Sequence, residues 1–185
     1  MTAKVRIDKL IDEVIAREGE YSDHPADRGG PTRWGVTERV ARAHGYVGEM
    51  KRFPREMAVQ IYRDLYWHRP GFDAVEGIYE RVAEELLDTG INMGPKVASK
   101  FLQRALNVLN REGRDYPDVP ADGEVGPLTL AALRGFKARR GADGETVLMR
   151  AIEGLQAERY IALAEQRPAN EAFLYGWIAN RVGLS

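Results

Sequence analysis

Apolar residues recur with helical spacing in one segment of this chain after another. Near the N-terminus Ile7, Leu10, Ile11, Val14 and Ile15 follow the pattern of a helix with one apolar stripe, which predicts a helix over about 7–18. Comparable patterns, several with proline or threonine at the start, predict further helices over about 37–44, 54–68, 77–91, 95–110, 127–140, 144–166 and 170–182. The sequence therefore predicts a mainly α fold.

One segment departs from this pattern. Residues 20–37, "EYSDHPADRGGPTRWGVT", are rich in Asp, Pro and Gly, and "DRGGP" is a strong turn signal. The stretch "TRWGVT" contains residues that favour strands, which predicts a small β-hairpin directly after the first helix. The expected architecture is a helical bundle with this one minor β element.

A single carboxylate of the first helix falls on its apolar side. Helical projection places Glu18 near the centre of the apolar stripe, whereas the other acidic residues of the segment fall away from its middle. Gly19 follows at once and is the usual left-handed helix stop. Two interpretations are open: a structural carboxylate that pairs with Arg17 or Arg33, or a general acid whose pKa is raised by desolvation.

Composition limits the classes of protein to consider. The chain has 185 residues, 44% of them hydrophobic, which suffices for one compact domain or two small lobes. A formal net charge of −1 gives no indication of nucleic-acid or anionic-membrane binding. The absence of cysteine excludes disulfides, thiolate catalysis and cysteine-ligated metals. The N-terminus has no apolar signal region, so we expect synthesis as a soluble cytoplasmic protein.

The segment around Glu18 resembles a known family. "EGEYSDHPADRGGPTRWGVT" is similar to the opening signature of the glycoside hydrolase family 108 muramidases, which are phage endolysin-type lysozymes. The similarity continues through "YRDLYWHRPGFDAV" and "ELLDTGINMGPKVASKFLQRALN", and "DGEVGPLTLAAL" resembles the helical peptidoglycan-binding region of that family. Glu20 departs from the pattern, which usually has a second glycine there. The resemblance implies a lysozyme-like α+β fold, with a catalytic region over 1–94 and a peptidoglycan-binding-like region over 95–185 packed as one unit.

The resemblance also implies roles for three residues. Glu18 would be the acid that protonates the β-1,4 bond between N-acetylmuramic acid and N-acetylglucosamine. Asp27 would be the second carboxylate, which stabilises an oxocarbenium-like transition state or orients water, although an Asp here could also only satisfy turn amides. Thr32 would position water, or would simply pack as a strand threonine.

Sugar binding needs flat apolar faces and amide groups. The candidates are Tyr21, Trp34, Tyr62, Tyr66, Trp67 and Asn92, which we expect to line a cleft between the hairpin and the helical region. Tyr62 and Tyr66 share a helix face and could instead be core residues, and Asn92 could simply end a helix. His24, His44 and His68 are not spaced as metal ligands, so we expect neither a metal nor a cofactor.

Peptidoglycan glycan strands are the expected partner, and we expect a monomer that does not bind nucleic acid. The basic cluster of Arg134, Lys137, Arg139 and Arg140 could be a solvated face or could contact anionic wall polymers or lipid head groups. The predicted function is an N-acetylmuramidase that lyses the host of a phage once a pore-forming partner releases it. A lytic transglycosylase and a non-catalytic peptidoglycan-binding phage structural protein are the alternatives.

Overall fold

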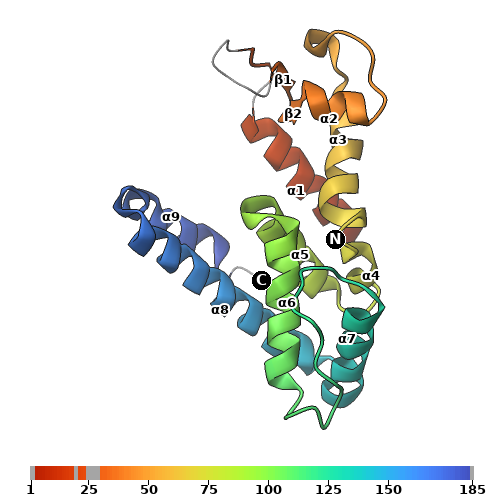
Figure 1. The fold of residues 1–185 in the computed structure, drawn as a ribbon, viewed down its shortest axis with the longest axis vertical. Coiled ribbons are helices and arrows are strands. Elements are labelled where there is room, and N and C mark those ends of the chain that lie inside the picture. The colour runs from red at the N-terminus through yellow and green to blue at the C-terminus, as the bar shows by residue number, and fades with distance from the viewer. Residues whose placement is uncertain (1–2, 19–20, 24–29, 184–185) are drawn as a thin grey trace. The chain divides into compact units, whose positions relative to one another are not determined.

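The computed structural model describes residues 3–18, 21–23 and 30–183, with side chains in the first helix from Ile7 to Ala16. Within these residues the protein is mainly α and has one two-stranded antiparallel sheet, as the sequence predicts (Figure 1). The chain forms two compact units, Met1–Arg69 (unit 1) and Pro70–Ser185 (unit 2). The predicted functional division into residues 1–94 and 95–185 stays a prediction.

Unit 1 is built on two long elements that run in opposite directions. Its elements are α1 (Ala3–Glu18), β1 (Thr32–Arg33), β2 (Val36–Thr37), α2 (Glu38–Ala43), a 3-10 turn (Met50–Arg52), α3 (Arg55–Arg63) and a π-helical turn (Asp64–His68). Ion pairs join Asp8 to Arg63 and Asp12 to Arg55, the latter at 2.7 Å, so α1 and α3 are antiparallel. The end of α1 therefore lies toward the start of α3, on the side of the unit where Figure 1 shows the hairpin.

The hairpin and the next helix follow from local sequence signals. Trp34 and Gly35 form the two-residue turn between β1 and β2, with φ angles of 54° and 74°, as a type I′ turn requires. The side chain of Thr37 accepts a hydrogen bond from the amide of Val40 and caps α2. Gly45, at φ 85°, follows the end of that helix. Both features agree with the helix predicted over about 37–44.

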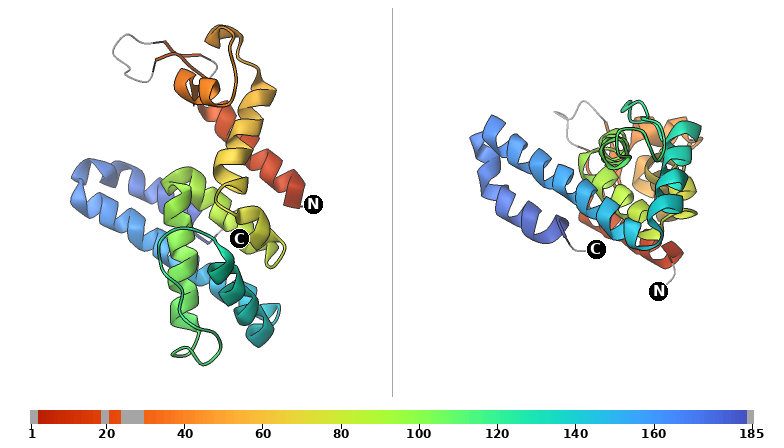
Figure 2. Two further views of the ribbon diagram at one scale, coloured as in Figure 1. Left: turned by 45° about the vertical axis from the view of Figure 1, so that its right-hand side comes forward. Right: turned by 90° about the horizontal axis from the view of Figure 1, so that it is seen from below.

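The regular secondary structure of unit 2 is entirely helical in the residues described. It contains α4 (Phe72–Glu76), α5 (Glu80–Met93), α6 (Pro95–Leu109), α7 (Pro127–Arg140), α8 (Asp143–Gln166), a 3-10 turn (Pro168–Asn170) and α9 (Glu171–Arg181), arranged as Figure 2 shows. The predicted helix over 77–91 is in fact α5, and the sequence analysis missed the short α4 before it. None of the helices in the described part of the chain is both long and apolar enough to cross a membrane.

The core of unit 2 lies where α5 and α6 pack together. Val82, Leu86 and Leu87 of α5 are fully buried, and so are Leu102 and Leu106 of α6. Gly94 has a φ of 94°, which turns the chain between the two helices, and Pro95 occupies the first turn of α6. These two helices therefore form one packed pair across Gly94.

Amide side chains of α6 order the long connection to α7. Gln103 is buried and its Nε2 donates to the Asp122 carboxylate at 2.8 Å, while its Oε1 accepts from the Gly123 amide at 2.8 Å. Asn107 exchanges two hydrogen bonds with the backbone of Val119, at 2.8 and 2.9 Å. Side chains thus supply hydrogen-bond partners to the backbone of this loop, which a helix or sheet would otherwise provide.

Candidate functional site

The last residue of α1 is Glu18, where the sequence predicts the helix to end. Ile11 and Ile15 are fully buried, and position 18 follows them by seven and three residues along the same helix. Residues with this spacing share a helix face, so helical periodicity assigns position 18 to the same face of α1 as these two isoleucines. The Glu18 side chain and the whole of Asp27 lie outside the described residues, so their catalytic roles stay predictions.

The chain returns to the hairpin soon after α1. Ser22 and Thr32 form a β-bridge with two backbone hydrogen bonds of 2.9 and 2.8 Å. Ser22 is only four residues after Glu18, a span of about 14 Å at most when fully extended. The end of α1 and Thr32 therefore belong to one region of unit 1, and Asp27 lies between the paired residues in sequence.

Thr32 and Trp34 are the site candidates on the hairpin. Thr32 is half-buried and its hydroxyl donates to the carbonyl of Gly30 at 3.5 Å. The Trp34 indole is also half-buried, and its Nε1 donates to the carbonyl of Phe53 at 3.2 Å. The guanidinium carbon of Arg33 lies over the ring, 5.3 Å from its centroid. These contacts fix the indole against the segment that precedes α3.

Trp34 has an unusual backbone conformation for its residue type. A positive φ is rare for a bulky residue and costs of the order of 1 kcal/mol, whereas Asn or Gly would accept it readily. The chain thus carries a tryptophan at the tip of the hairpin despite this cost.

Tyr21 lies just after the end of α1. Its side chain is 37% exposed, and its hydroxyl donates to the Asp23 carboxylate at 3.1 Å. The ammonium of Lys51 lies 5.6 Å from the ring centroid. The ring is accessible to a ligand, and its predicted role in sugar binding stays a prediction.

The three aromatic candidates at the end of α3 pack closely. The rings of Tyr62 and Tyr66 are stacked, with centroids 5.6 Å apart, so they share a face as predicted. Tyr62 is 8% exposed, which favours the core interpretation for this residue, whereas Tyr66 is half-buried. Trp67 is 5% exposed. The π-helical turn places one extra residue here, since the Arg69 amide bonds the carbonyl of Asp64. Their contribution to sugar binding stays a prediction.

Comparison with known proteins identifies the families that the two parts of the chain match. Residues 11–94 match the family described as Glycosyl hydrolase 108, and residues 97–182 match the family described as Predicted Peptidoglycan domain. The chain carries a glycosyl hydrolase 108 domain. The resemblance stated from the sequence is therefore confirmed, and with it the coarse chemistry of a glycoside hydrolase whose binding partner is peptidoglycan.

A solved structure shares both parts of the chain. The structure of Brucella abortus SagA is 27% identical in sequence, with a TM-score of 0.59, and the match covers 95% of this chain and 89% of that chain. No curated protein sequence matches this chain. The similarity to SagA thus extends over the glycosyl hydrolase 108 domain and the peptidoglycan domain together.

The strained indole of the glycosyl hydrolase 108 domain gives a testable expectation. Trp34→Asn should keep the hairpin, because Asn tolerates a positive φ, and should change the free energy of unfolding by no more than about 1 kcal/mol. If the indole stacks on a sugar, the affinity for peptidoglycan oligomers should fall about tenfold. Thermal unfolding and isothermal titration with the same preparation would check both results. An unchanged affinity would show that the indole only anchors the hairpin.

Asn92 lies in unit 2, on the last turn of α5. Its Nδ2 donates to the backbone carbonyl of Asp88 at 2.7 Å and to the Asp88 carboxylate at 3.2 Å. It lines a pocket with residues of α8 and α9 that the sequence analysis did not single out, among them Arg159 and Trp177. Because these residues are far apart in sequence, only the tertiary structure could bring them together. The sugar-binding role of Asn92 stays a prediction.

The basic cluster lies at the end of α7 in the peptidoglycan domain. Arg139 pairs with Asp115 at 3.5 Å, and the ammonium of Lys137 donates to the carbonyl of Ile78. Neighbouring groups thus engage part of its charge, and its contact with anionic polymers stays a prediction. Within residues 3–18, 21–23 and 30–183, no group of three or more His, Asp or Glu could hold a metal ion.

Proposed function

We propose that the glycosyl hydrolase 108 domain is an N-acetylmuramidase in which Glu18 is the general acid. The observation that carries this proposal is the register of α1, which puts position 18 on the face defined by the buried Ile11 and Ile15. A carboxyl group on such a face is desolvated, and desolvation favours its protonated form. A carboxylic acid that keeps its proton near neutral pH can protonate the oxygen of a glycosidic bond.

Two further groups would complete the chemistry. Asp27 would act as the second carboxylate, either by stabilising the positive charge that develops on the sugar ring or by orienting water. Thr32 would help to position that water. Its pairing with Ser22, four residues after Glu18, supports a common location for the acid and this hydroxyl.

The biological role extends the same proposal. The peptidoglycan domain over residues 97–182 would keep the enzyme on its insoluble substrate while the catalytic domain cuts successive bonds. We propose an endolysin role: the protein is made in the host cytoplasm and degrades the cell wall at lysis. The resemblance of residues 18–37 to phage endolysin-type lysozymes supports this role.

Product analysis tests the bond that is cut. Purified peptidoglycan is digested, and the new reducing ends are reduced with borohydride and identified by mass spectrometry. We expect muramitol ends, because a muramidase hydrolyses the bond on the reducing side of N-acetylmuramic acid. Glucosaminitol ends would contradict the proposed bond specificity. Anhydro-muramic products, one water lighter, would show a lytic transglycosylase, and the absence of any product would favour a non-catalytic binding protein.

A further inference from the structure

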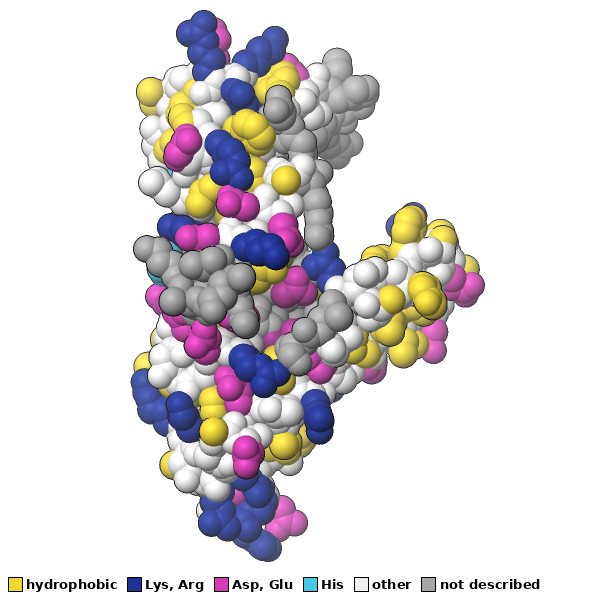
Figure 3. Space-filling view, turned by 180° about the vertical axis from the view of Figure 1, so that it is seen from behind, with side chains coloured by type: hydrophobic (Ala, Val, Ile, Leu, Met, Phe, Trp, Pro, Cys, Tyr) yellow, Lys and Arg dark blue, Asp and Glu magenta, His cyan; other side chains and the backbone are white. Residues whose placement is uncertain are grey.

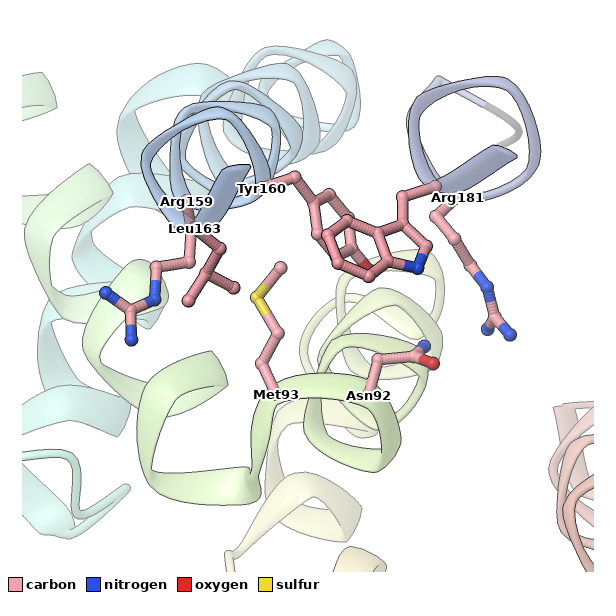
Figure 4. Close-up of a pocket in the computed structure, with 7 residues that line it drawn as sticks. Asn92, Met93, Arg159, Tyr160, Leu163 and Arg181 are labelled. Carbon is pink, nitrogen blue, oxygen red and sulfur yellow. The ribbon is translucent and has the colours of Figure 1, made fainter. Parts of the chain in front are cut away.

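A pocket of about 390 Å³ lies within unit 2. Seven residues from three helices line it: Asn92 and Met93 at the end of α5, Arg159, Tyr160 and Leu163 of α8, and Trp177 and Arg181 of α9 (Figure 4). A volume in this range suits one sugar or a short peptide with its attached groups.

The middle of the pocket is apolar and aromatic. The rings of Tyr160 and Trp177 are stacked, with centroids 5.3 Å apart, and Figure 4 shows Met93 and Leu163 projecting into the space beside Tyr160. Phe173 stacks on the indole of Trp177 at 6.1 Å. Exposed apolar side chains also gather over α8 and α9 in Figure 3. Ile161 of α8 and Phe173 and Tyr175 of α9 are exposed. These surfaces suit methyl groups and the C–H face of a sugar.

Some polar groups of the pocket are already paired within the protein, and one is available to bind a ligand. The Asp88 carboxylate pairs with Arg181 at 2.8 Å and accepts from Asn92 at 3.2 Å, so much of the positive charge of Arg181 is compensated. Arg159 is exposed at the edge of the pocket, and among the described residues no hydrogen bond or ion pair engages its guanidinium. Its guanidinium can bind a carboxylate with two parallel hydrogen bonds.

We propose that this pocket binds peptidoglycan where the peptide stem joins N-acetylmuramic acid. A free carboxylate of the stem peptide, beyond the amide bond that joins the stem to the sugar, pairs with Arg159, and the sugar or its acetamido methyl packs on Met93, Leu163 and Trp177. A neutral N-acetylglucosamine oligomer offers no carboxylate to Arg159, so the pocket distinguishes peptidoglycan from neutral glycans. This inference rests on peptidoglycan as the partner of residues 97–182 and is independent of the role proposed for Glu18.

The test measures binding without hydrolysis. The probe is the soluble disaccharide N-acetylglucosaminyl-N-acetylmuramic acid that carries a pentapeptide, which lacks the bond that a muramidase cuts. Isothermal titration compares the full chain with its Arg159→Gln and Arg159→Lys variants. We expect Arg159→Gln to weaken binding about tenfold, Arg159→Lys to recover part of the affinity, and added salt to weaken binding by the wild-type protein.

Arg150 provides the matched control. It is exposed on α8, and its nine-residue separation from Arg159 puts it on the opposite face of that helix. Arg150→Gln should bind the probe as the wild-type protein does, and neutral chitotriose should show no dependence on Arg159. An unaltered affinity in Arg159→Gln, an equal loss in Arg150→Gln, or no binding of the probe would overturn the proposal. Each of these failures would leave the assignment of Glu18 untouched.

Discussion

Glu18→Gln is expected to reduce the rate of peptidoglycan hydrolysis by about 10²–10⁴-fold while the protein folds normally. Removal of a positioned general acid typically costs this much, because the leaving oxygen must then depart as an alkoxide or take its proton from water. Glutamine has nearly the same shape as a protonated glutamic acid, so the packing of α1 should be preserved.

The measurement is the initial rate at which purified peptidoglycan loses turbidity, together with circular dichroism of each variant. Glu13→Gln is the matched control, because Glu13 is an exposed carboxylate of the same helix, 3.8 Å from the ammonium of Lys9. This variant should clear the substrate at the wild-type rate. Full activity in Glu18→Gln would overturn the proposed chemistry, and equal losses in both variants would point to damage to α1.

The second large effect concerns Glu85, a carboxyl group buried between α5 and α8. It is 9% exposed and accepts a hydrogen bond of 3.0 Å from the Thr89 hydroxyl, which in turn accepts one from Gln156 at 3.0 Å. Burial raises the pKa of Glu85 from 4.5 to about 8, although the bond from Thr89 opposes this rise and the charges of Asp88 and Glu153 add to it. The side chain therefore holds its proton in the folded protein at neutral pH.

This proton makes stability depend on pH in a defined direction. Between pH 4.5 and 8 the folded protein retains a proton that the unfolded chain has released, so Glu85 contributes most below pH 4.5 and its contribution falls as the pH rises. We expect the loss to be about 2 kcal/mol between pH 6 and pH 8. Glu85→Gln cannot ionise, so it should be more stable than the wild-type protein at pH 8 and should show a flatter profile.

Urea unfolding at several pH values would measure the effect. Other groups also titrate in this range, so the informative quantity is the difference between the variant and the wild-type protein at each pH. Glu158→Gln, which changes an exposed carboxylate of α8, should parallel the wild-type profile. If the curve for Glu85→Gln also ran parallel to it, Glu85 would not be the group that retains the proton.

Elements with strong local signals could be predicted from the sequence. Thr37 caps α2 and Pro95 starts α6 because these residues act on the backbone within one turn, whatever the rest of the fold does. The short α4 was missed because no long apolar pattern marks its five residues. The π-helical turn at Asp64–His68 was also missed, since the pattern of an ordinary helix continues through it.

The candidate sites also include features that the sequence could predict and features that it could not. The end of α1 at Glu18 could be predicted because it depends only on local signals, namely the apolar periodicity and the glycine that follows in sequence. The burial of Glu85 could not be predicted, because Gln156 and Glu153, which surround it, belong to a helix far along the chain. The pocket at Arg159 was missed for the same reason, and Asn92 alone among its lining residues carried a sequence signal.

The packed pair that α5 and α6 form across Gly94 limits how this architecture can be recombined. The match to Glycosyl hydrolase 108 ends at residue 94, in the middle of that pair. A fragment cut there would leave the apolar stripe of α5, with Leu86 and Leu87, bare to water, at a cost of a few kcal/mol for each side chain. Exchange of modules between relatives, by evolution or by an engineer, therefore does least damage at Arg69–Pro70, where the compact units divide.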